Sequence, residues 1–456
     1  MIKLSFFGSA QEVTGSCFLL DDGKNKILID CGLFQCPKFC DIRSHEAFPF
    51  DPKSISAAFV THAHIDHTGR IPKLVKDGFK GRIYSTSPTM DLSELMLKDS
   101  LGVMTKEALR EKGPLLYGEE DVNNAVKIWE GKNYHDKIMV GDFSVSFLDA
   151  GHILGSAMVL VEIKNKRLLF TGDLGNPSNP LLLGTEKIAN IDYLIIESTY
   201  GDREHEDVAG KKLKLERVIE KSILQKGVLM IPAFSLERTQ ELLWEISGML
   251  KNKQIPNVPI FLDSPLAIRA TEIYQKYYSY LNRARVDQKS FSFLNLPQVH
   301  PTLTTDESKK INDVPPPKII IAGSGMSTGG RILHHERRYL PDPKSTILFI
   351  GYQAAGSLGR RIQDGADSVT ILGEEVQVLC HKEAITATPR IPTKPSFLNL
   401  YEKNQTLLKK STQPTASQKR LWPSSKNSAT ISASRPSPRN TARVLKFKLL
   451  LCIMGL

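Results

Sequence analysis

The segment THAHIDHTG at residues 61–69 restricts the fold and chemistry of this chain most strongly, because His62, His64, Asp66 and His67 fall within six positions. The apolar run AAFV before it is typical of a strand, which places these side chains at a strand end. In extended backbone the first three share one side, while His67 projects differently. Imidazole and carboxylate groups bind Zn²⁺, and burying four of them together is costly without a cation. The segment therefore predicts a metal site, with a polar surface turn as the alternative.

Two further candidate ligands follow other apolar runs and are bracketed by glycine: His152 in DAGHILGSA and Asp173 in FTGDLGN. Each residue alone is more often part of a turn. Taken together with the 61–69 segment, they favour a two-metal site, and two cations about 3.5–4 Å apart can activate water and bind both oxygens of a phosphoryl transfer. The first ion would be bound by His62, His64 and His152, and the second by Asp66 and His67, with Asp173 bridging them.

Asp30 ends the apolar run KILIDCG and can accept a hydrogen bond from a metal-binding imidazole, which would orient that ring. A carboxylate in a strand-end turn is an alternative role of nearly equal weight.

The spacing of apolar residues along the sequence divides the chain into three regions. Short β-rich runs alternate with turns in residues 1–195, which predicts a layered α/β sandwich. A helix is expected over 89–101, with Thr89 or Asp91 as its cap. Apolar strands alternate with helical patterns in 196–343, which predicts a parallel sheet buried on both faces. The strand-like runs in 344–378 are expected to return to the first sandwich, so the α/β domain is an insertion.

The net charge of +11 belongs to the C-terminal segment. Residues 379–456 hold 14 basic and 2 acidic side chains, which leaves −1 for residues 1–378. Bulk charge therefore gives no argument for nucleic-acid binding by the main part of the chain. The segment 379–456 has one glycine, no aspartate and no sustained period, so we expect disorder. Its last run, LKFKLLLCIMGL, is too short to span a bilayer; an interfacial anchor is a weaker alternative.

Several classes of protein are excluded. No apolar run reaches about 18 residues, so no membrane span or membrane partner is expected. Six cysteines without a CxxC pair do not form a disulfide framework, and the start MIKLSFFGS is typical of a strand and not of a secretory signal. A reducing, cytoplasmic setting is the expectation.

The HxHxDH pattern with a later Gly-His and Gly-Asp resembles the metallo-β-lactamase superfamily. Five further segments resemble its β-CASP branch, whose members include RNA- and DNA-processing nucleases: GSAQEVTGSCFLL (8–20), ESTYGDREH (197–205), PAFSLERTQE (232–241), LDSPLA (262–267) and AGSGMSTGGR (322–331). The resemblance implies an αββα sandwich with an inserted β-CASP α/β domain. It divides the chain into a first sandwich part (1–195), the insertion (196–343), return strands (344–378) and an aberrant tail (379–456).

The resemblance also implies a function. It indicates a hydrolase with two Zn²⁺ ions that cleaves phosphodiester bonds of single-stranded RNA, with Asp66 and Glu197 as catalytic residues. A hydrolase of a small ester or thioester and an inactive product are the alternatives. Whether cleavage is internal or from an end, and whether the chain forms a homodimer, are left open.

The family's substrate-facing positions match Arg238 and, in the Gly-rich loop, Ser324, Gly325, Met326 and Arg331. Backbone N–H groups of such a loop bind phosphate well, and an arginine adds a bidentate charge. A tight turn is the alternative role of the loop. For Glu197 the alternative is a capping or salt-bridging carboxylate.

Two histidine segments of the family, Ser-Ala-His-x-Asp and His-Gly-Glu, are missing after Val378, where His381 is the single histidine. Residues 387–394 (ATPRIPTK) can be encoded by bases that, read one position earlier, spell GYSAHTDQ. The same shift over 414–417 permits HGE. Our hypothesis is therefore a shifted reading frame beginning near residues 378–385, which would remove a general acid and a ligand of the second metal.

Overall fold

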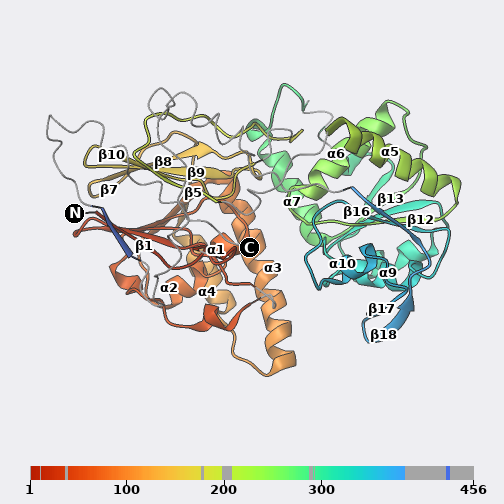
Figure 1. Ribbon diagram of the computed structural model, residues 1–456, viewed down its shortest axis with the longest axis horizontal. Coiled ribbons are helices and arrows are strands. Elements are labelled where there is room, and N and C mark those ends of the chain that lie inside the picture. The colour runs from red at the N-terminus through yellow and green to blue at the C-terminus, as the bar shows by residue number, and fades with distance from the viewer. Residues whose placement is uncertain are drawn as a thin grey trace, which may run out of the picture. The chain divides into compact units, whose positions relative to one another are not determined.

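The computed structural model describes residues 2–10, 12–35, 40–175, 179–197, 208–286, 291, 293–385 and 428–431. The chain forms two compact units (Figure 1). Unit 1 contains Met1–Pro177, Gly184–Arg203 and Ile391–Leu456, and unit 2 contains Ser178–Leu183 and Glu204–Arg390.

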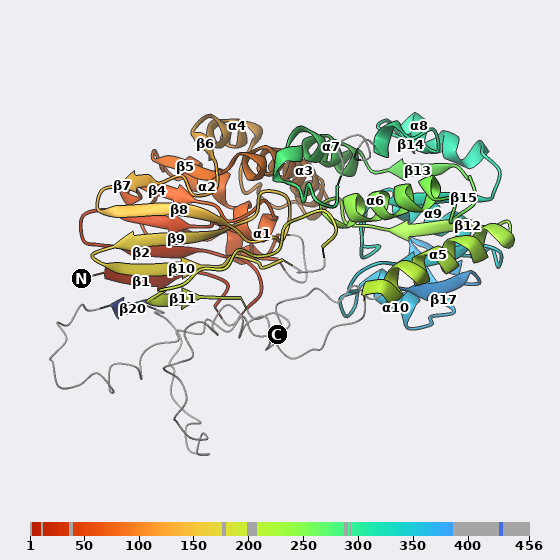
Figure 2. The same ribbon diagram turned by 90° about the horizontal axis from the view of Figure 1, so that it is seen from above.

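Unit 1 is built on two sheets that lie face to face (Figure 2). The first sheet begins with an antiparallel meander and continues with parallel strands, in the order β20 (Ser428–Ile431), β1 (Ile2–Phe6), β2 (Phe18–Asp21), β3 (Lys26–Ile29), β4 (Ala57–Phe59), β5 (Arg82–Thr86), β6 (Trp129–Lys132). The second is antiparallel except for its β10–β11 pair, in the order β11 (Tyr193–Ile195), β10 (Lys166–Phe170), β9 (Ala157–Ile163), β8 (Phe143–Asp149), β7 (Ile138–Val140).

Alternating apolar residues fill the space between the two sheets. In β8, Phe143, Val145 and Phe147 are buried, and the serines between them are partly exposed, as the period of two in a strand requires. Phe147 packs against Phe59 of β4 with ring centroids 6.2 Å apart. This aromatic core fixes the ends of strands from both sheets at the same edge.

Helices cover the outer face of the first sheet (Figures 1 and 2). They are α1 (Ile65–Thr68), α2 (Ile71–Lys76), α3 (Ser87–Glu111) and α4 (Glu119–Lys127), with short 3₁₀ turns at Ile42–His45 and Pro52–Ser54. The helix expected over 89–101 is α3, and its cap is Thr86, whose hydroxyl accepts the N–H of Thr89. On the outer face of the second sheet, the described apolar residues that pack together all lie within residues 148–196.

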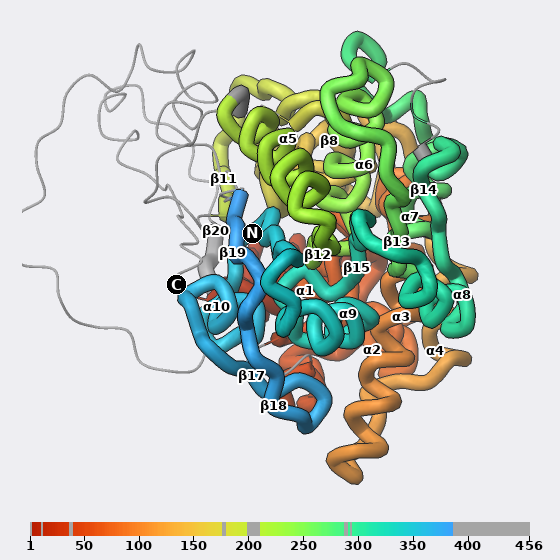
Figure 3. Tube along the Cα trace, turned by 90° about the vertical axis from the view of Figure 1, so that its right-hand side faces the viewer, coloured from red at the N-terminus to blue at the C-terminus, as the bar shows by residue number. Residues whose placement is uncertain are grey.

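Unit 2 has the predicted parallel sheet (Figure 3). Its order is β14 (Val299–Pro301), β13 (Ile260–Asp263), β15 (Lys318–Ala322), β12 (Val228–Pro232), β16 (Thr346–Phe349), β19 (His381–Ala384). Helices α5 (Val208–Leu224) and α6 (Arg238–Lys251) lie on one face, and α9 (Ile332–Tyr339) and α10 (Leu358–Gln363) on the other. The remaining elements are α7 (Pro265–Lys276), α8 (Thr305–Lys310), 3₁₀ turns at Tyr278–Tyr280, Phe293–Asn295 and Ile311–Asp313, and the hairpin β17 (Ser368–Ile371)–β18 (Glu374–Gln377).

The structure corrects two predicted boundaries. The expectation that 344–378 return to the first sandwich is wrong, because β16 pairs with β12 in the parallel sheet of unit 2. The predicted tail, 379–456, begins too early, because β19 pairs with β16, and Cys380 and Ile385 are buried. Apart from β20, residues after 385 lie outside the described residues, and so does the predicted disorder of that segment.

In unit 1, the loop after β3 lies directly against the α1 turn that carries Asp66 and His67. Cys31 N–H donates to the His67 carbonyl at 2.8 Å, and Ser16 N–H donates to the Asp66 carbonyl at 2.9 Å. Gly32 lies between these bonds, and a Cβ atom at this position would lie 1.5 Å from the Asp66 carbonyl oxygen. A side chain at position 32 therefore cannot coexist with the observed position of the turn.

We expect Gly32→Ala to displace the Asp66–His67 turn and to lower the free energy of unfolding by about 1–3 kcal/mol, the usual cost of overpacking. Thermal or denaturant unfolding measures this change. Gly102→Ala in α3 is the control, since a Cβ there meets nothing within 4 Å. Equal stability of the two variants would contradict the close approach at Gly32.

In unit 2, a buried carboxyl group links three segments. Glu237 has φ 66° and ψ −62°, and the Arg238 N–H donates to the Leu236 carbonyl at 2.9 Å, which is the strained γ-turn geometry. Its carboxyl accepts hydrogen bonds from the Tyr274 hydroxyl and the Asn179 amide. Burial, reinforced by the negative charge of Glu241, raises the pKa of Glu237 to about 8. The folded state therefore holds this carboxyl protonated at neutral pH.

Between pH 4.5 and 8 the folded state binds one more proton at Glu237 than the unfolded state does, so this group makes stability fall as pH rises. The free energy of unfolding of the wild type, minus that of Glu237→Gln, should decrease over this range by up to about 1.4 kcal/mol per pH unit. Denaturant titrations at several pH values measure it, with the exposed Glu272→Gln as control. Parallel pH curves for the wild type and Glu237→Gln would contradict the protonated state.

Candidate metal centre

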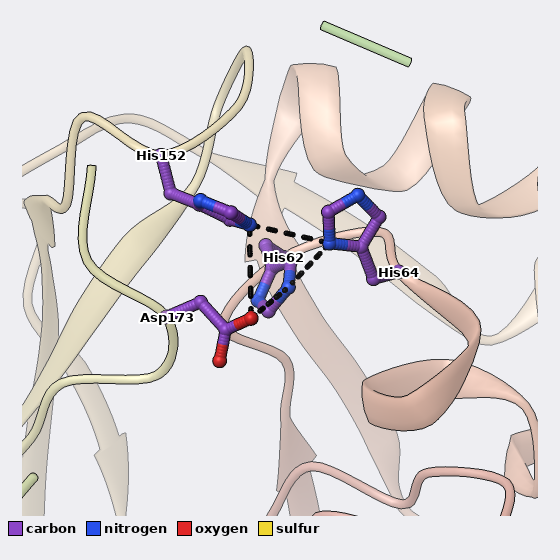
Figure 4. A group of neighbouring side chains, drawn as sticks. All are labelled: His62, His64, His152 and Asp173. Atoms are coloured by element: carbon purple, nitrogen blue, oxygen red, sulfur yellow. Dashed lines mark hydrogen bonds and ion pairs between the residues drawn. The ribbon is translucent and has the colours of Figure 1, made fainter. Parts of the chain in front are cut away.

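Four side chains from three loops of unit 1 point toward one another (Figure 4). His62 and His64 lie between β4 and α1, His152 follows β8, and Asp173 follows β10. One ligand atom from each lies within 4.8 Å of the others. Ligands predicted from separate parts of the sequence are therefore brought together at one edge of the sandwich.

The distances fit a metal ion of the size of zinc. His64 Nδ1 lies 3.0 Å from His62 Nε2 and 3.2 Å from His152 Nε2. Asp173 Oδ2 lies 3.7 Å from both Nε2 atoms. A tetrahedral site with bonds of about 2.0–2.1 Å separates its ligand atoms by about 3.3 Å. These four distances, out of the six among the four atoms, are therefore close to the spacing in a single tetrahedral site.

A second group of ligand atoms lies beside the first. His67 Nε2 is 3.3 Å from Asp173 Oδ1 and 3.8 Å from Asp66 Oδ2. Asp173 thus directs one carboxylate oxygen to each group, which is the geometry of a bridging ligand. All six predicted ligands lie in these two groups.

The protonation states follow from burial and charge. Burial, aided by the nearby charge of His67, holds the pKa of His62 well below its ordinary value, so the ring is neutral. Burial alone would also lower the pKa of His67, but the charges of Asp173, Asp30 and Asp66 outweigh it and raise the pKa well above its ordinary value. Without a metal ion, a proton on His67 thus compensates the carboxylates, a role that a bound cation can take.

Hydrogen bonds from neighbouring residues hold the ligand loops. Ser156 Oγ accepts the N–H of His152 at 2.9 Å, and Ala157 N–H donates to the Thr61 carbonyl at 2.7 Å. Glu197 is buried, and its Oε1 accepts the N–H of Leu174 at 2.7 Å, directly after Asp173. The carboxylate of Glu197 therefore fixes the loop that carries the bridging ligand.

Asp30 lies where the sequence predicts a residue that orients a ligand. Its Oδ2 is 2.7 Å from His67 Nδ1, and both groups are buried. Thr61, which the sequence analysis missed, supplies a hydroxyl 3.0 Å from Asp30 Oδ2 and 3.0 Å from His62 Nδ1. Its position just before His62 in the sequence indicates that it lies near the candidate site, but not that Asp30 is its partner.

The predicted substrate-binding residues lie in unit 2. Arg238 begins α6, and its guanidinium donates to Glu241 at 2.7 Å. The Arg331 guanidinium donates to buried Asp263 at 2.7 Å and to the carbonyls of Thr302 and Leu303, both at 2.9 Å. These contacts engage Arg331 inside its own unit, and its binding of substrate stays a prediction.

The Gly-rich loop after β15 is closed by its own hydrogen bonds. Ser324 Oγ accepts the N–H groups of Thr328 at 3.0 Å and Gly329 at 3.2 Å. A Cβ atom at Gly325 would lie 2.6 Å from the Phe234 ring, and the Met326 carbonyl accepts the N–H of Gly359 at 3.1 Å. The loop is thus a fixed turn, whose binding of phosphate stays a prediction.

Comparisons with known proteins match both units. Residues 10–218 match the metallo-beta-lactamase superfamily model and residues 239–362 match the Beta-Casp domain model. A protein named ribonuclease TTHA0252 from Thermus thermophilus is 38% identical over 375 residues, 81% of this chain and 84% of that protein. A protein named RNase J-like protein from Methanocaldococcus jannaschii is 35% identical over 376 residues, 81% of this chain and 82% of that protein.

A crystal structure of a protein of unknown function from Enterococcus faecalis shares the fold, with a TM-score of 0.50 at 15% identity over 87% of this chain and 90% of that one. In the part of the chain that the structure describes, no helix combines the length and the apolar character that crossing a membrane requires. The chain is a metal-dependent hydrolase of the metallo-β-lactamase superfamily and belongs to the branch that carries a β-CASP domain.

Proposed function

We propose that this chain is a zinc-dependent phosphodiesterase that cleaves single-stranded RNA. The observation that carries the proposal is the bridging geometry of Asp173, which directs one oxygen toward the His62–His64–His152 group and the other toward His67. A pair of cations about 3.5–4 Å apart is typical of enzymes that cleave phosphodiesters. The choice of RNA is supported by the relatives named ribonuclease and RNase J-like protein.

Each residue has a role in this proposal. His62, His64 and His152 hold the first zinc ion, and Asp66 and His67 hold the second, with Asp173 shared between them. Two bound zinc ions supply an activated water and positive charge for the phosphoryl oxygens.

The other predicted residues have supporting roles, each within its own unit. Glu197 keeps Asp173 in place through its bond to the Leu174 N–H. Arg238 and the loop with Ser324, Gly325 and Met326 offer a cation and polar groups for the RNA backbone.

The metal content tests the site directly. We expect the purified chain to bind two zinc ions, the second more weakly because the shifted frame removes one of its ligands. We expect His152→Ala to lose at least the ion of the first position, since only His62, His64 and Asp173 remain there. Elemental analysis after equilibrium dialysis measures the stoichiometry. His135→Ala is the matched control, because this exposed histidine of unit 1 lies outside both groups of ligands. Unchanged zinc content in His152→Ala would refute the assignment.

Cleavage of a labelled oligoribonucleotide tests the reaction. We expect the zinc-loaded chain to cleave it, and Asp173→Asn to lose more than about 100-fold in rate, because metal charge stabilisation is worth several kcal/mol. A chelator should abolish cleavage and added zinc should restore it. A thioester of small size is the parallel substrate; turnover of the thioester without cleavage of RNA would replace the proposal by its alternative.

The shifted reading frame adds a prediction about rate. If the Ser-Ala-His-x-Asp segment supplies the general acid, a chain whose codons after residue 385 are read one base earlier, so that they encode this segment, should cleave RNA about 10²–10⁴-fold faster than the chain with the given sequence. Parallel rate measurements under zinc saturation compare the two. Equal rates would refute the hypothesis. It would also be refuted if the gene's codons, read one base earlier, did not encode the Ser-Ala-His-x-Asp segment.

A further inference from the structure

Thr61 lies at the junction between the two groups of ligands. Its side chain is buried, two residues after the end of β4 and next to His62. The hydroxyl oxygen is 3.0 Å from His62 Nδ1, 3.3 Å from His67 Nδ1 and 3.0 Å from Asp30 Oδ2. The Thr61 N–H also donates to Asp30 Oδ1 at 2.8 Å. One hydroxyl group therefore contacts a ligand of each metal position and the carboxylate behind them.

The donors and acceptors admit one consistent arrangement of hydrogens. A carboxylate only accepts hydrogen bonds, so the Thr61 hydroxyl donates to Asp30 and its lone pairs remain available. The N–H at His62 Nδ1 then donates to Thr61, and the N–H at His67 Nδ1 donates to Asp30. When a bound cation replaces the proton on His67 Nε2, both rings have a lone pair on Nε2, the atom that each directs at Asp173.

We propose that Thr61 and Asp30 form one positioning unit that fixes the tautomer of one ligand in each metal position and so couples the zinc affinities of the two positions. This inference rests on the two zinc positions of the proposed function. His62 donates to the Thr61 hydroxyl, which donates to Asp30, and His67 donates to the same carboxylate. When either ring binds a metal ion, it therefore orders the hydroxyl and the carboxylate that orient the other ring.

The side chain of Thr61 can be changed without removing its other contacts. Its carbonyl accepts the Ala157 N–H, a backbone bond that any residue keeps. The side chain is closely packed, since a Cβ at Gly172 would lie 2.7 Å from Thr61 Cβ. Valine keeps the shape and removes the hydroxyl, whereas serine keeps the hydroxyl and removes the methyl group.

We expect Thr61→Val to weaken zinc binding at the first position by about 10–100-fold, the usual effect of removing the hydrogen-bond partner of a metal-binding side chain. Binding at the second position should weaken less, and the binding of one ion should no longer strengthen that of the other. Thr61→Ser should stay within about threefold of the wild type. Competition with a chromophoric chelator on the full chain measures both affinities, and the absorption of bound Co²⁺ reports the geometry of each position.

Ser16→Ala is the matched control. Ser16 Oγ also donates to Asp30 Oδ2 at 3.0 Å, but no hydrogen bond links it to either imidazole. If Thr61 acts through the imidazoles, Ser16→Ala weakens zinc binding clearly less than Thr61→Val does. If Ser16→Ala weakens binding as much as Thr61→Val does, the hydroxyl only stabilises a buried carboxylate, and the proposal falls.

The tautomers of the two histidine rings can be measured on the wild-type chain, so this test does not depend on whether a variant folds. In the zinc-loaded chain, ¹⁵N–¹H correlation spectra of the histidine rings should show His62 and His67 protonated at Nδ1. A ring of His62 protonated at Nε2, a chain that binds only one zinc, or independent binding of two zinc ions would overturn the proposal. A chain that binds two zinc ions with coupled affinities but leaves RNA intact would refute the proposed function alone.

Discussion

The buried carboxylate of Asp30 is the interaction on which the arrangement of unit 1 depends. It lies at the end of β3 and accepts hydrogen bonds from the Thr61 backbone, the hydroxyls of Thr61 and Ser16, and the ring of His67. These partners come from the starts of β2 and α1 and from the end of β4. A buried carboxylate without such donors would cost several kcal/mol. The same bonds that satisfy Asp30 therefore fix the segment from which four of the six ligands project.

The two sheets explain why the remaining ligands reach this segment. Phe59 of β4 packs on Phe147 of β8, and Ala157 at the start of β9 donates its N–H to the Thr61 carbonyl. The apolar core thus sets the spacing between the sheets, and the loop after β8 brings His152 to the end of β4. Substitutions that change this spacing will act on the metal centre at a distance, because interiors are closely packed and transmit small shifts.

The sequence predicted which candidate ligands cluster better than it predicted the contacts of the loops that carry them. His62 to His67 were recognisable because short spacing in one segment fixes their directions, and glycines marked the turns at His152 and Asp173. The role of Thr61 depends on a residue 31 positions away, and no local pattern carries that information. The placement of 344–378 failed for a similar reason. An apolar strand such as β16 indicates burial on both faces but not the sheet in which it pairs.

The balance of donors and acceptors separates a metal site from a structural polar cluster. In unit 2, Asp263 accepts from Thr302 and Arg331 on one oxygen and from Ser308 and His335 on the other, so each acceptor atom faces donors. In unit 1, His62 Nε2, His152 Nε2 and Asp173 Oδ2 gather around His64 Nδ1, and each of these atoms binds a metal through a lone pair. Hydrogen bonds link these atoms only in pairs, through a hydrogen on one ring nitrogen of each pair, whereas one cation can bind all four through their lone pairs. This convergence of ligand atoms, and not the number of histidines, is the physical reason to place a metal ion in unit 1 and none at Asp263.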